Sequence, residues 1–179
     1  MKNRVLLVFA LIVLGSQTFA QEKKDAKPKA TAEADTVAPY LKYPKLPAFN
    51  IRLMDSVTIF NTYNIPEGKK TILLYFSPEC GHCQSLFRKL IKEMDSLKNV
   101  QIYLLTSVHD MGLLREFYKE YHLADYKNIK AAGRDYEFFF IAYYRIKAFP
   151  DMALYDEHKK LIKLFEGDIA ISELMKYIR

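Results

Sequence analysis

The stretch Ser77-Pro78-Glu79-Cys80-Gly81-His82-Cys83 contains both cysteines of the 179-residue chain. Two residues separate the thiols, so the pair can close a small disulfide ring, open to a dithiol, or supply half of a metal site. An apolar run precedes the pair and a helical pattern follows it. The surrounding sequence is needed to distinguish a redox pair from a structural disulfide or a metal site.

The segments on either side of the cysteines predict a strand, a helix and a second strand. Residues 71–76 form a continuous apolar run between a turn and Ser77-Pro78, which is typical of a central strand covered on both faces. From Cys83 to Leu97, apolar residues recur at steps of three and four and indicate one buried helix face. A second strand-like run covers residues 100–106. Such a unit implies parallel strands joined by a right-handed crossover.

The remaining patterns predict further short elements around this unit. One or two strands fit residues 49–63, and Asp110 can cap a helix whose apolar residues continue to Tyr121. The later expectations are a short strand at 128–132, an aromatic-rich helix at 135–146, a hairpin at 152–165, and a last helix capped at Gly167-Asp168. The aromatic side chains of the 136–144 segment are expected to be core, with a platform for a partner protein as the alternative.

Composition favours one globular domain with a substantial core, because 50% of the residues are hydrophobic. The formal net charge is +6. Without Lys2 and Arg4, 25 basic and 21 acidic residues remain, which leaves a charge of +4. This mild surplus, without clustered arginine in the sequence, gives little support for nucleic-acid binding.

Residues 1–20 have the pattern of a secretory signal peptide. Lys2 and Arg4 precede an apolar run from Val5 to Leu14, and Ala20 offers a small residue for cleavage before Gln21. An uncleaved membrane anchor is the alternative, but the run is shorter than the roughly 20 residues of a full span. Residues 21–47 are expected to form a charged, proline-containing linker that is extended over residues 39–47, and the domain is expected to begin near Ala48. The protein is therefore expected outside the cytoplasm, soluble or loosely tethered, where disulfides persist.

The order of these elements resembles the thioredoxin superfamily, and most closely its extracytoplasmic TlpA/ResA-like branch. The resemblance covers residues 48–179 and rests on the Cys80-Gly81-His82-Cys83 motif after a strand, Phe149-Pro150 before a hairpin, and the closing helix. It implies a three-layer α/β/α fold with a central mixed sheet and an inserted helix before the strand that follows a cis-proline. It also implies thiol–disulfide exchange with client proteins, without a cofactor, supplied with electrons by a membrane or extracytoplasmic thiol partner.

Three positions depart from the family pattern. Glu79 stands where tryptophan usually precedes the first cysteine, and Leu74 stands where a buried acid usually helps to move protons for the second. The dipeptide Gly81-His82 resembles protein disulfide isomerases more than typical thioredoxins. The branch mostly reduces disulfides, which slightly favours a reductase, while the dipeptide leaves an oxidase or isomerase open. The proton acceptor for Cys83 is not identified.

The two cysteines are expected to play different roles. Cys80 would lie at a helix N-terminus, where free N–H groups and the helix dipole favour a thiolate, so it is the expected attacking thiol. Cys83 lies one turn further on the apolar face and is the expected resolving thiol. A donor or protonated imidazole at His82 would stabilise the Cys80 thiolate and make the disulfide more oxidising, whereas the carboxylate of Glu79 opposes the thiolate.

The second part of the expected site is Phe149-Pro150. The resemblance implies that Pro150 is cis and packs against the cysteines, and that the backbone of Phe149 pairs with an extended client peptide. Spacing alone leaves an ordinary trans proline at the start of an edge strand equally open.

Three other interpretations remain open from the sequence. A structural disulfide is disfavoured because such a small loop removes little chain entropy. A zinc or copper module would need more ligands, and His109, His122 and His158 are scattered. A binding protein without redox activity does not explain the intact cysteine pair.

Overall fold

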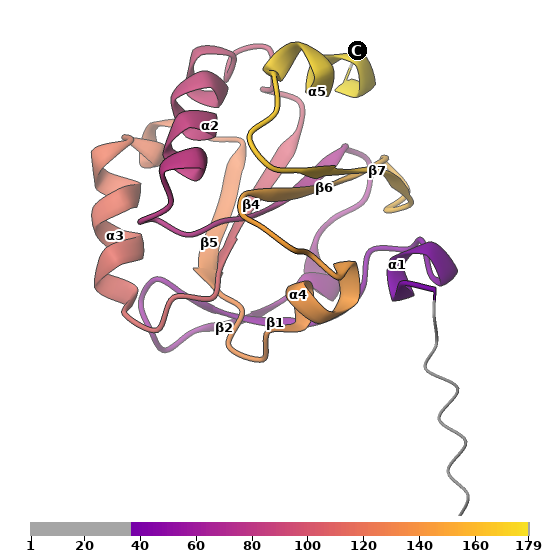
Figure 1. The fold of residues 1–179 in the computed structure, drawn as a ribbon, viewed down its shortest axis with the longest axis horizontal. Coiled ribbons are helices and arrows are strands. Elements are labelled where there is room, and N and C mark those ends of the chain that lie inside the picture. Colours follow the sequence, from indigo (N-terminus) through magenta and orange to yellow (C-terminus); the bar gives the residue numbers. More distant parts are fainter. Residues whose placement is uncertain (1–36, 179) are drawn as a thin grey trace, which may run out of the picture. The chain divides into compact units, whose positions relative to one another are not determined.

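The computed structural model describes residues 37–178, which contain one mixed β-sheet with helices on both faces (Figure 1). The expected signal peptide and the first part of the expected linker lie outside the described residues. The strands are β1 (Asn50–Leu53), β2 (Ile59–Asn61), β3 (Thr71–Tyr75), β4 (Gln101–Thr106), β5 (Ile129–Arg134), β6 (Asp151–Tyr155) and β7 (Leu161–Glu166). The helices are α1 (Pro39–Lys42), α2 (Gly81–Lys92), α3 (Met111–Glu120), α4 (Phe139–Tyr144) and α5 (Ile171–Ile178), with short 3-10 turns at Thr62–Asn64 and Leu123–Asp125.

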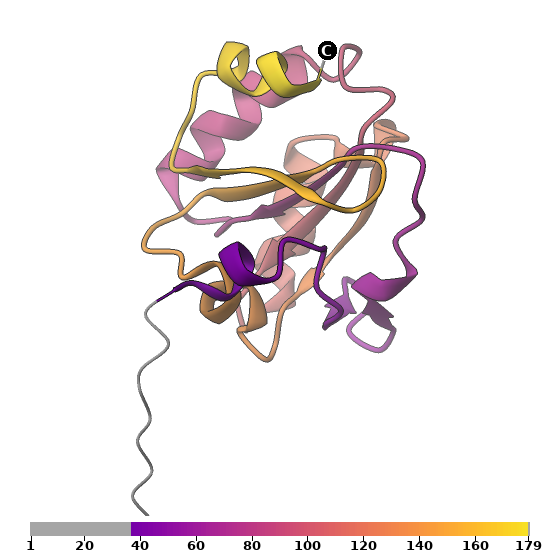
Figure 2. The ribbon, with the colours of Figure 1, turned by 90° about the vertical axis from the view of Figure 1, so that its right-hand side faces the viewer.

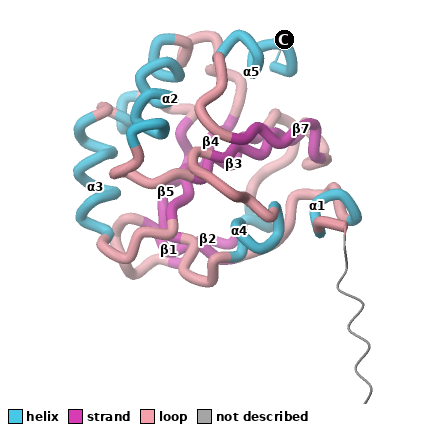
Figure 3. The backbone as a smooth tube through the Cα atoms, viewed as in Figure 1, coloured by secondary structure: helices cyan, strands magenta, loops and turns pink. Residues whose placement is uncertain are grey.

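The sheet order is β2-β1-β5-β4-β3-β6-β7 within the described part of the chain. Strands β3, β4 and β5 are parallel, whereas β1, β2, β6 and β7 join antiparallel to their neighbours. The predicted strand–helix–strand unit is therefore present, and Figure 3 shows how helices and strands alternate through it. Within residues 37–178, no helix combines the length and apolar character needed to cross a bilayer.

The two faces of the sheet bury two separate hydrophobic clusters. Helices α2, α3 and α5 cover one face, and α4 with α1 lies on the other, as the two ribbon views show (Figures 1 and 2). All five residues of β3 are buried because alternate side chains enter the two clusters. Leu74 enters the α2 side and Tyr75 enters the α4 side. This is the three-layer arrangement that the resemblance implied.

The inserted helix α4 is shorter than the expected span of 135–146. The carboxylate of Asp135 accepts hydrogen bonds from the backbone N–H groups of Phe139 (3.0 Å) and Phe140 (2.8 Å) and so caps the helix N-terminus. Phe138 (φ 54°) and Arg145 (φ 52°) adopt left-handed conformations that end the helix on both sides. Phe140 and Tyr144 are buried, which confirms the prediction that this segment contributes to the core.

Two expectations about connecting segments are wrong. The stretch 39–47, expected to be extended, contains α1, and the ring of Tyr40 lies 5.8 Å from that of Tyr144 on α4. A β-bridge between Lys45 and Lys160 also holds the stretch in place, and the side chains of Tyr40 and Leu46 pack against the cluster on the α4 side. Asp168 does not cap α5, which begins at Ile171, but forms an ion pair with Lys89 on α2.

Candidate functional site

The turn that carries the cysteines connects the end of β3 to the start of α2. The N–H of Cys80 donates to the carbonyl oxygen of Ser77 (3.1 Å), and the side-chain amide of Gln84 donates to that of Pro78 (3.0 Å). Cys80 is the N-cap residue of α2, and its side chain makes no capping hydrogen bond. The turn is thus held from both sides and places the Cys80 sulfur at the beginning of the helix, as predicted.

The two thiols have different surroundings. Both are free, with Cys80 half-buried and Cys83 completely buried on the apolar face of α2. Burial, together with the nearby Cys80, raises the pKa of the Cys83 thiol to about 12, although a backbone hydrogen bond at Ser77 works against this rise. Cys83 therefore remains protonated at neutral pH, while Cys80 is the sulfur within reach of another molecule.

Phe149 and Pro150 lie beside Cys80. The Phe149–Pro150 peptide bond is cis, as the resemblance implied. The Cys80 sulfur lies 3.9 Å from the carbonyl oxygen of Phe149. The carbonyl oxygen of Pro150 accepts a hydrogen bond from the N–H of Gly167 (2.7 Å), which ties this loop to the end of β7. The fold thus brings together the two predicted parts of the site.

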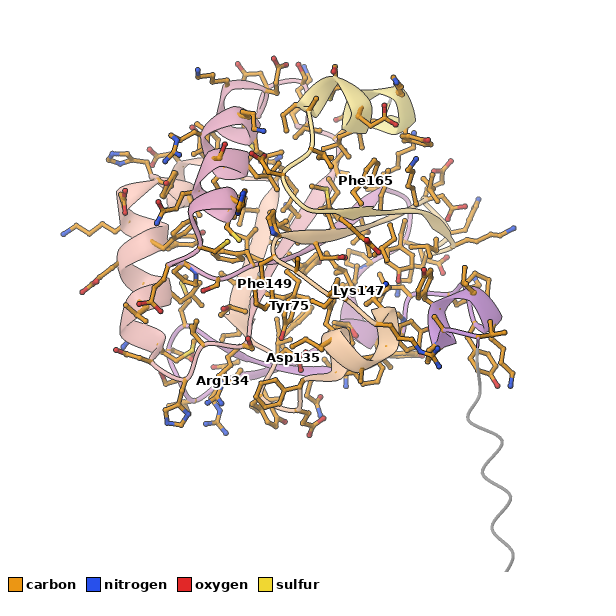
Figure 4. All side chains as sticks on the ribbon, in the orientation of Figure 1. Tyr75, Arg134, Asp135, Lys147, Phe149 and Phe165 are labelled. Atoms are coloured by element: carbon orange, nitrogen blue, oxygen red, sulfur yellow. The ribbon has the colours of Figure 1, made fainter. Side chains whose placement is uncertain are left out.

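An aromatic stack supports Phe149 from the α4 side of the sheet. The ring of Phe149 lies 5.6 Å from that of Tyr75, which in turn stacks on Phe140 at 4.7 Å. Figure 4 shows Tyr75 adjacent to Phe149 at the centre of the molecule. Burial raises the pKa of the Tyr75 hydroxyl well above its ordinary value, so this side chain is neutral. The sequence predicted these aromatic residues as core but did not indicate that they support the loop before Pro150.

His82 and Glu79 are both exposed next to Cys80. The charge of His82 acts on Asp168. Although burial raises the pKa of Asp168, hydrogen bonds from Lys89 and Ser85 and the charges of Lys89 and His82 lower it overall. An acid–base cluster that the sequence did not predict therefore lies beside His82. The carboxylate of this cluster belongs to Asp168 in the segment before α5, where the sequence pattern had predicted a helix cap.

Within β3, no acidic side chain points to the α2 side, where the family's buried acid would lie and where this chain has Leu74. Leu74 is completely buried in the same apolar cluster as Cys83. A buried acid does follow Pro150, since Asp151 is only 1% exposed. However, Asp151 pairs with Tyr75 across β3 and β6, so its side chain points to the face opposite Cys83. Its two carboxylate oxygens have no hydrogen-bond partner among the described residues.

Burial, together with the charge of Glu166, its partner on β7, raises the pKa of Asp151 to about 8, although a backbone hydrogen bond at Met152 works against this rise. Sequence patterns did not indicate this group, because Asp151 resembles an ordinary turn residue between proline and a strand. Among residues 37–178, no three histidine, cysteine, aspartate or glutamate side chains lie close enough together to hold a metal ion.

Comparison with solved structures identifies the same architecture in several bacterial proteins. A secreted disulfide oxidoreductase of Mycobacterium tuberculosis, described as homologous to E. coli DsbE, is 16% identical and superposes with a TM-score of 0.60 over 73% of this chain and 93% of its own. The thioredoxin domain of a thiol-disulfide oxidoreductase from Bacteroides vulgatus is 16% identical, with a TM-score of 0.59 over 75% and 96%. StoA from Bacillus subtilis is 18% identical, with a TM-score of 0.55 over 76% and 100%.

At these identities the likeness establishes the fold. A comparison with curated protein sequences finds no match. The sequence model of the thioredoxin-like domain, in contrast, matches residues 63–179, which include the cysteine turn, the Phe149-Pro150 loop and the closing helix. The chain therefore belongs to the thioredoxin-like family.

Proposed function

We propose that the protein is an extracytoplasmic thiol–disulfide oxidoreductase that reduces disulfides of client proteins through Cys80 and Cys83. The observation that carries this proposal is the difference between the two thiols. Cys80 is half-exposed at the start of α2, whereas Cys83 is buried one turn away with a pKa of about 12. Exchange needs one accessible sulfur and a second thiol held nearby in reserve.

The reaction proceeds in two balanced steps. The Cys80 thiolate attacks one sulfur of a client disulfide, forms a mixed disulfide and releases the other client sulfur as a thiolate, which takes up a proton. Cys83 then loses its proton and attacks the Cys80 sulfur, which forms the Cys80–Cys83 disulfide and releases the second client thiol. The client gains two electrons and the protein loses two. A dithiol partner protein, at the membrane or free, returns them by the reverse exchange.

The Phe149-Pro150 loop supports the placement of the client. The carbonyl oxygen of Phe149 lies 3.9 Å from the attacking sulfur, and the stack of Phe149 on Tyr75 holds the loop in this position. An extended client peptide that pairs with the Phe149 backbone would therefore bring its own sulfur next to Cys80. Its recognition depends mainly on backbone groups, which suits a protein with several clients.

An extracytoplasmic location is supported by the signal-peptide pattern of residues 1–20, in an environment where client disulfides persist. One structural neighbour is itself described as secreted. No cofactor is needed, because the two cysteines carry both electrons.

The experiment is reduction of insulin with excess dithiothreitol as the electron donor, with single Cys80→Ser, single Cys83→Ser and double variants beside a control at an exposed residue outside the site, Ser96→Ala. Catalytic turnover is expected in the wild type and the control and is lost in all three cysteine variants. Activity that survives in the double variant contradicts the mechanism. Stoichiometric zinc or copper in protein purified under reducing conditions would instead support a metal-binding module.

The reduction potential of the Cys80–Cys83 pair distinguishes the directions. A potential below about −220 mV supports a reductase, and one near about −120 mV supports an oxidase.

A further inference from the structure

A cavity of about 420 Å³ lies on the described surface at the carboxyl ends of β4 and β5. Three arginines, Arg52, Arg115 and Arg134, line it together with His109. In Figure 4, Arg134 lies near the lower edge of the molecule, beyond Asp135 and Tyr75 as seen from Phe149. The lining does not include either cysteine or the Phe149-Pro150 loop. The cavity is therefore separate from the redox site, and its volume is within the range of small-molecule sites.

The fold forces two of these positive charges together. Arg52 on β1 and Arg134 on β5 are directly opposite each other in an antiparallel pair. Their side chains start on the same face of the sheet, where like charges are destabilising. The close approach of the strands depends on Gly133, since a Cβ at that position would lie 2.5 Å from the carbonyl oxygen of Arg52. A purely structural role does not explain why both opposing positions carry arginine.

The charges of the three arginines are not neutralised by ion pairs in the part of the chain that the structure describes. The guanidinium of Arg52 lies 5.2 Å from the ring of Tyr136, and that of Arg115 donates to the carbonyl oxygen of Met54 (2.9 Å) and the hydroxyl of Ser56 (3.4 Å). The Nε of Arg134 is buried and has no hydrogen-bond partner among residues 37–178.

Asp110, which lines the cavity, and Asp135, which follows the lining residue Arg134, are already engaged with helix N-termini. Asp110 lines the cavity, but one of its oxygens accepts a hydrogen bond from the N–H of Gly112 (2.7 Å) at the start of α3. Asp135 follows Arg134 in the chain, and its carboxylate caps α4 through the N–H groups of Phe139 and Phe140. The planar guanidinium presents donors in a fork that matches oxygen atoms of phosphate and carboxylate groups.

We propose that this cavity binds a small, multiply charged oxyanion, either a phosphate ester or a polycarboxylate, between Arg52, Arg115 and Arg134. The bound anion neutralises the opposed pair Arg52 and Arg134. The proposal is independent of the redox chemistry, because the cavity shares no lining residue with the cysteine turn.

The test is calorimetric titration of the reduced protein at low ionic strength with pyrophosphate and, separately, with citrate. The variants are Arg52→Gln and Arg134→Gln, and Lys98→Gln is the matched control because it removes one positive charge from an exposed residue outside the cavity. Loss of a charge-assisted hydrogen bond is expected to weaken binding about 10-fold or more in each arginine variant. The control is expected to remain within about 2-fold of the wild type, because Lys98 precedes β4 and the cavity lies at the carboxyl end of that strand, where a single distant charge acts only weakly through water.

A second measurement separates binding from folding. Without ligand, Arg52→Gln is expected to melt at the same temperature as the wild type or higher, because it removes a like-charge contact. Tighter binding of pyrophosphate identifies the ligand class as phosphate, and tighter binding of citrate identifies it as polycarboxylate. The proposal is overturned if the wild type binds neither probe, or if Lys98→Gln weakens binding as much as the arginine variants.

Discussion

The sulfur of Cys80 lies 3.9 Å from the carbonyl oxygen of Phe149, although 69 positions separate the two residues in the chain. This proximity joins the cysteine turn after β3 to the loop before β6. Because β3 and β6 are neighbouring antiparallel strands, the carboxyl end of β3 and the amino end of β6 lie side by side. The nucleophile and the backbone group proposed to hold the client therefore occupy one site.

The first prediction concerns thiol reactivity. At pH 7–8, iodoacetamide is expected to modify one equivalent of thiol in the folded, reduced protein, at Cys80. Cys83 is buried and its pKa is raised to about 12, so its reactive thiolate is scarce at that pH. Peptide mapping after alkylation measures this, with unfolded protein as the control in which both thiols react. Modification of Cys83 before Cys80 would reverse the assigned roles.

The second prediction concerns the two side chains beside Cys80. His82→Ala is expected to make the reduction potential more negative by about 30 mV, because loss of an imidazole that stabilises the thiolate destabilises the reduced form. Glu79→Gln is expected to shift it in the opposite direction, since it removes a carboxylate that opposes the thiolate. Equilibration with glutathione buffers measures both. A more positive potential in His82→Ala would contradict this electrostatic interpretation.

The third prediction concerns the pH dependence of stability. The pKa of Asp151 is raised by burial to about 8, so the folded protein holds this proton more tightly than the unfolded chain does. The free energy of unfolding therefore decreases as the pH rises from about 4 to about 8. Asp151→Asn removes this titration. The free energy of unfolding of the variant, relative to that of the wild type, is therefore expected to be on the order of 4 kcal/mol higher at pH 8 than at pH 4.

Urea denaturation at both pH values measures this difference, with Asp95→Asn at an exposed position after α2 as a control. An Asp151→Asn effect that does not vary between pH 4 and pH 8 would show that the carboxyl titrates normally.

The fourth prediction concerns the aromatic stack under Phe149. Phe140 is completely buried against Tyr75, so Phe140→Ala is expected to lower the free energy of unfolding by about 3–5 kcal/mol. Phe138→Ala is the matched control, because this neighbouring side chain is 48% exposed and is expected to contribute less than about 1 kcal/mol. Thermal and urea unfolding measure both. Equal losses would show that burial does not distinguish the two rings.

Sequence patterns predicted the elements whose signals are local. The apolar run of 71–76 and the apolar stripe after Cys83 identified β3 and α2, because burial on both faces and on one helix face leave distinct periodicities. The order of elements in the thioredoxin superfamily then identified Phe149-Pro150 as the second part of the site. The predicted length of α4 was wrong because the apolar pattern does not show local backbone features. Asp135 caps N–H groups four and five residues further on, and Phe138 adopts a left-handed conformation.

The arginine cavity could not be predicted in the same way. Arg52, Arg115 and Arg134 are widely separated along the chain, and the sequence was interpreted as lacking clustered arginine. Only the pairing of β1 with β5 places Arg52 opposite Arg134. Likewise, the position of Asp151 on the face opposite Cys83 depends on its register with Tyr75. Both features follow from strand pairing between distant segments, which local periodicity does not specify.

The most direct test of the proposed mechanism is trapping of mixed disulfides by single cysteine variants. Cys83→Ser and Cys80→Ser are each incubated with a disulfide-containing protein, and the products are separated on non-reducing gels and mapped by mass spectrometry. We expect Cys83→Ser to accumulate a mixed disulfide through Cys80, because the resolving thiol is absent, and Cys80→Ser to accumulate none. A stable adduct through Cys83 in Cys80→Ser, with none in Cys83→Ser, would contradict the mechanism.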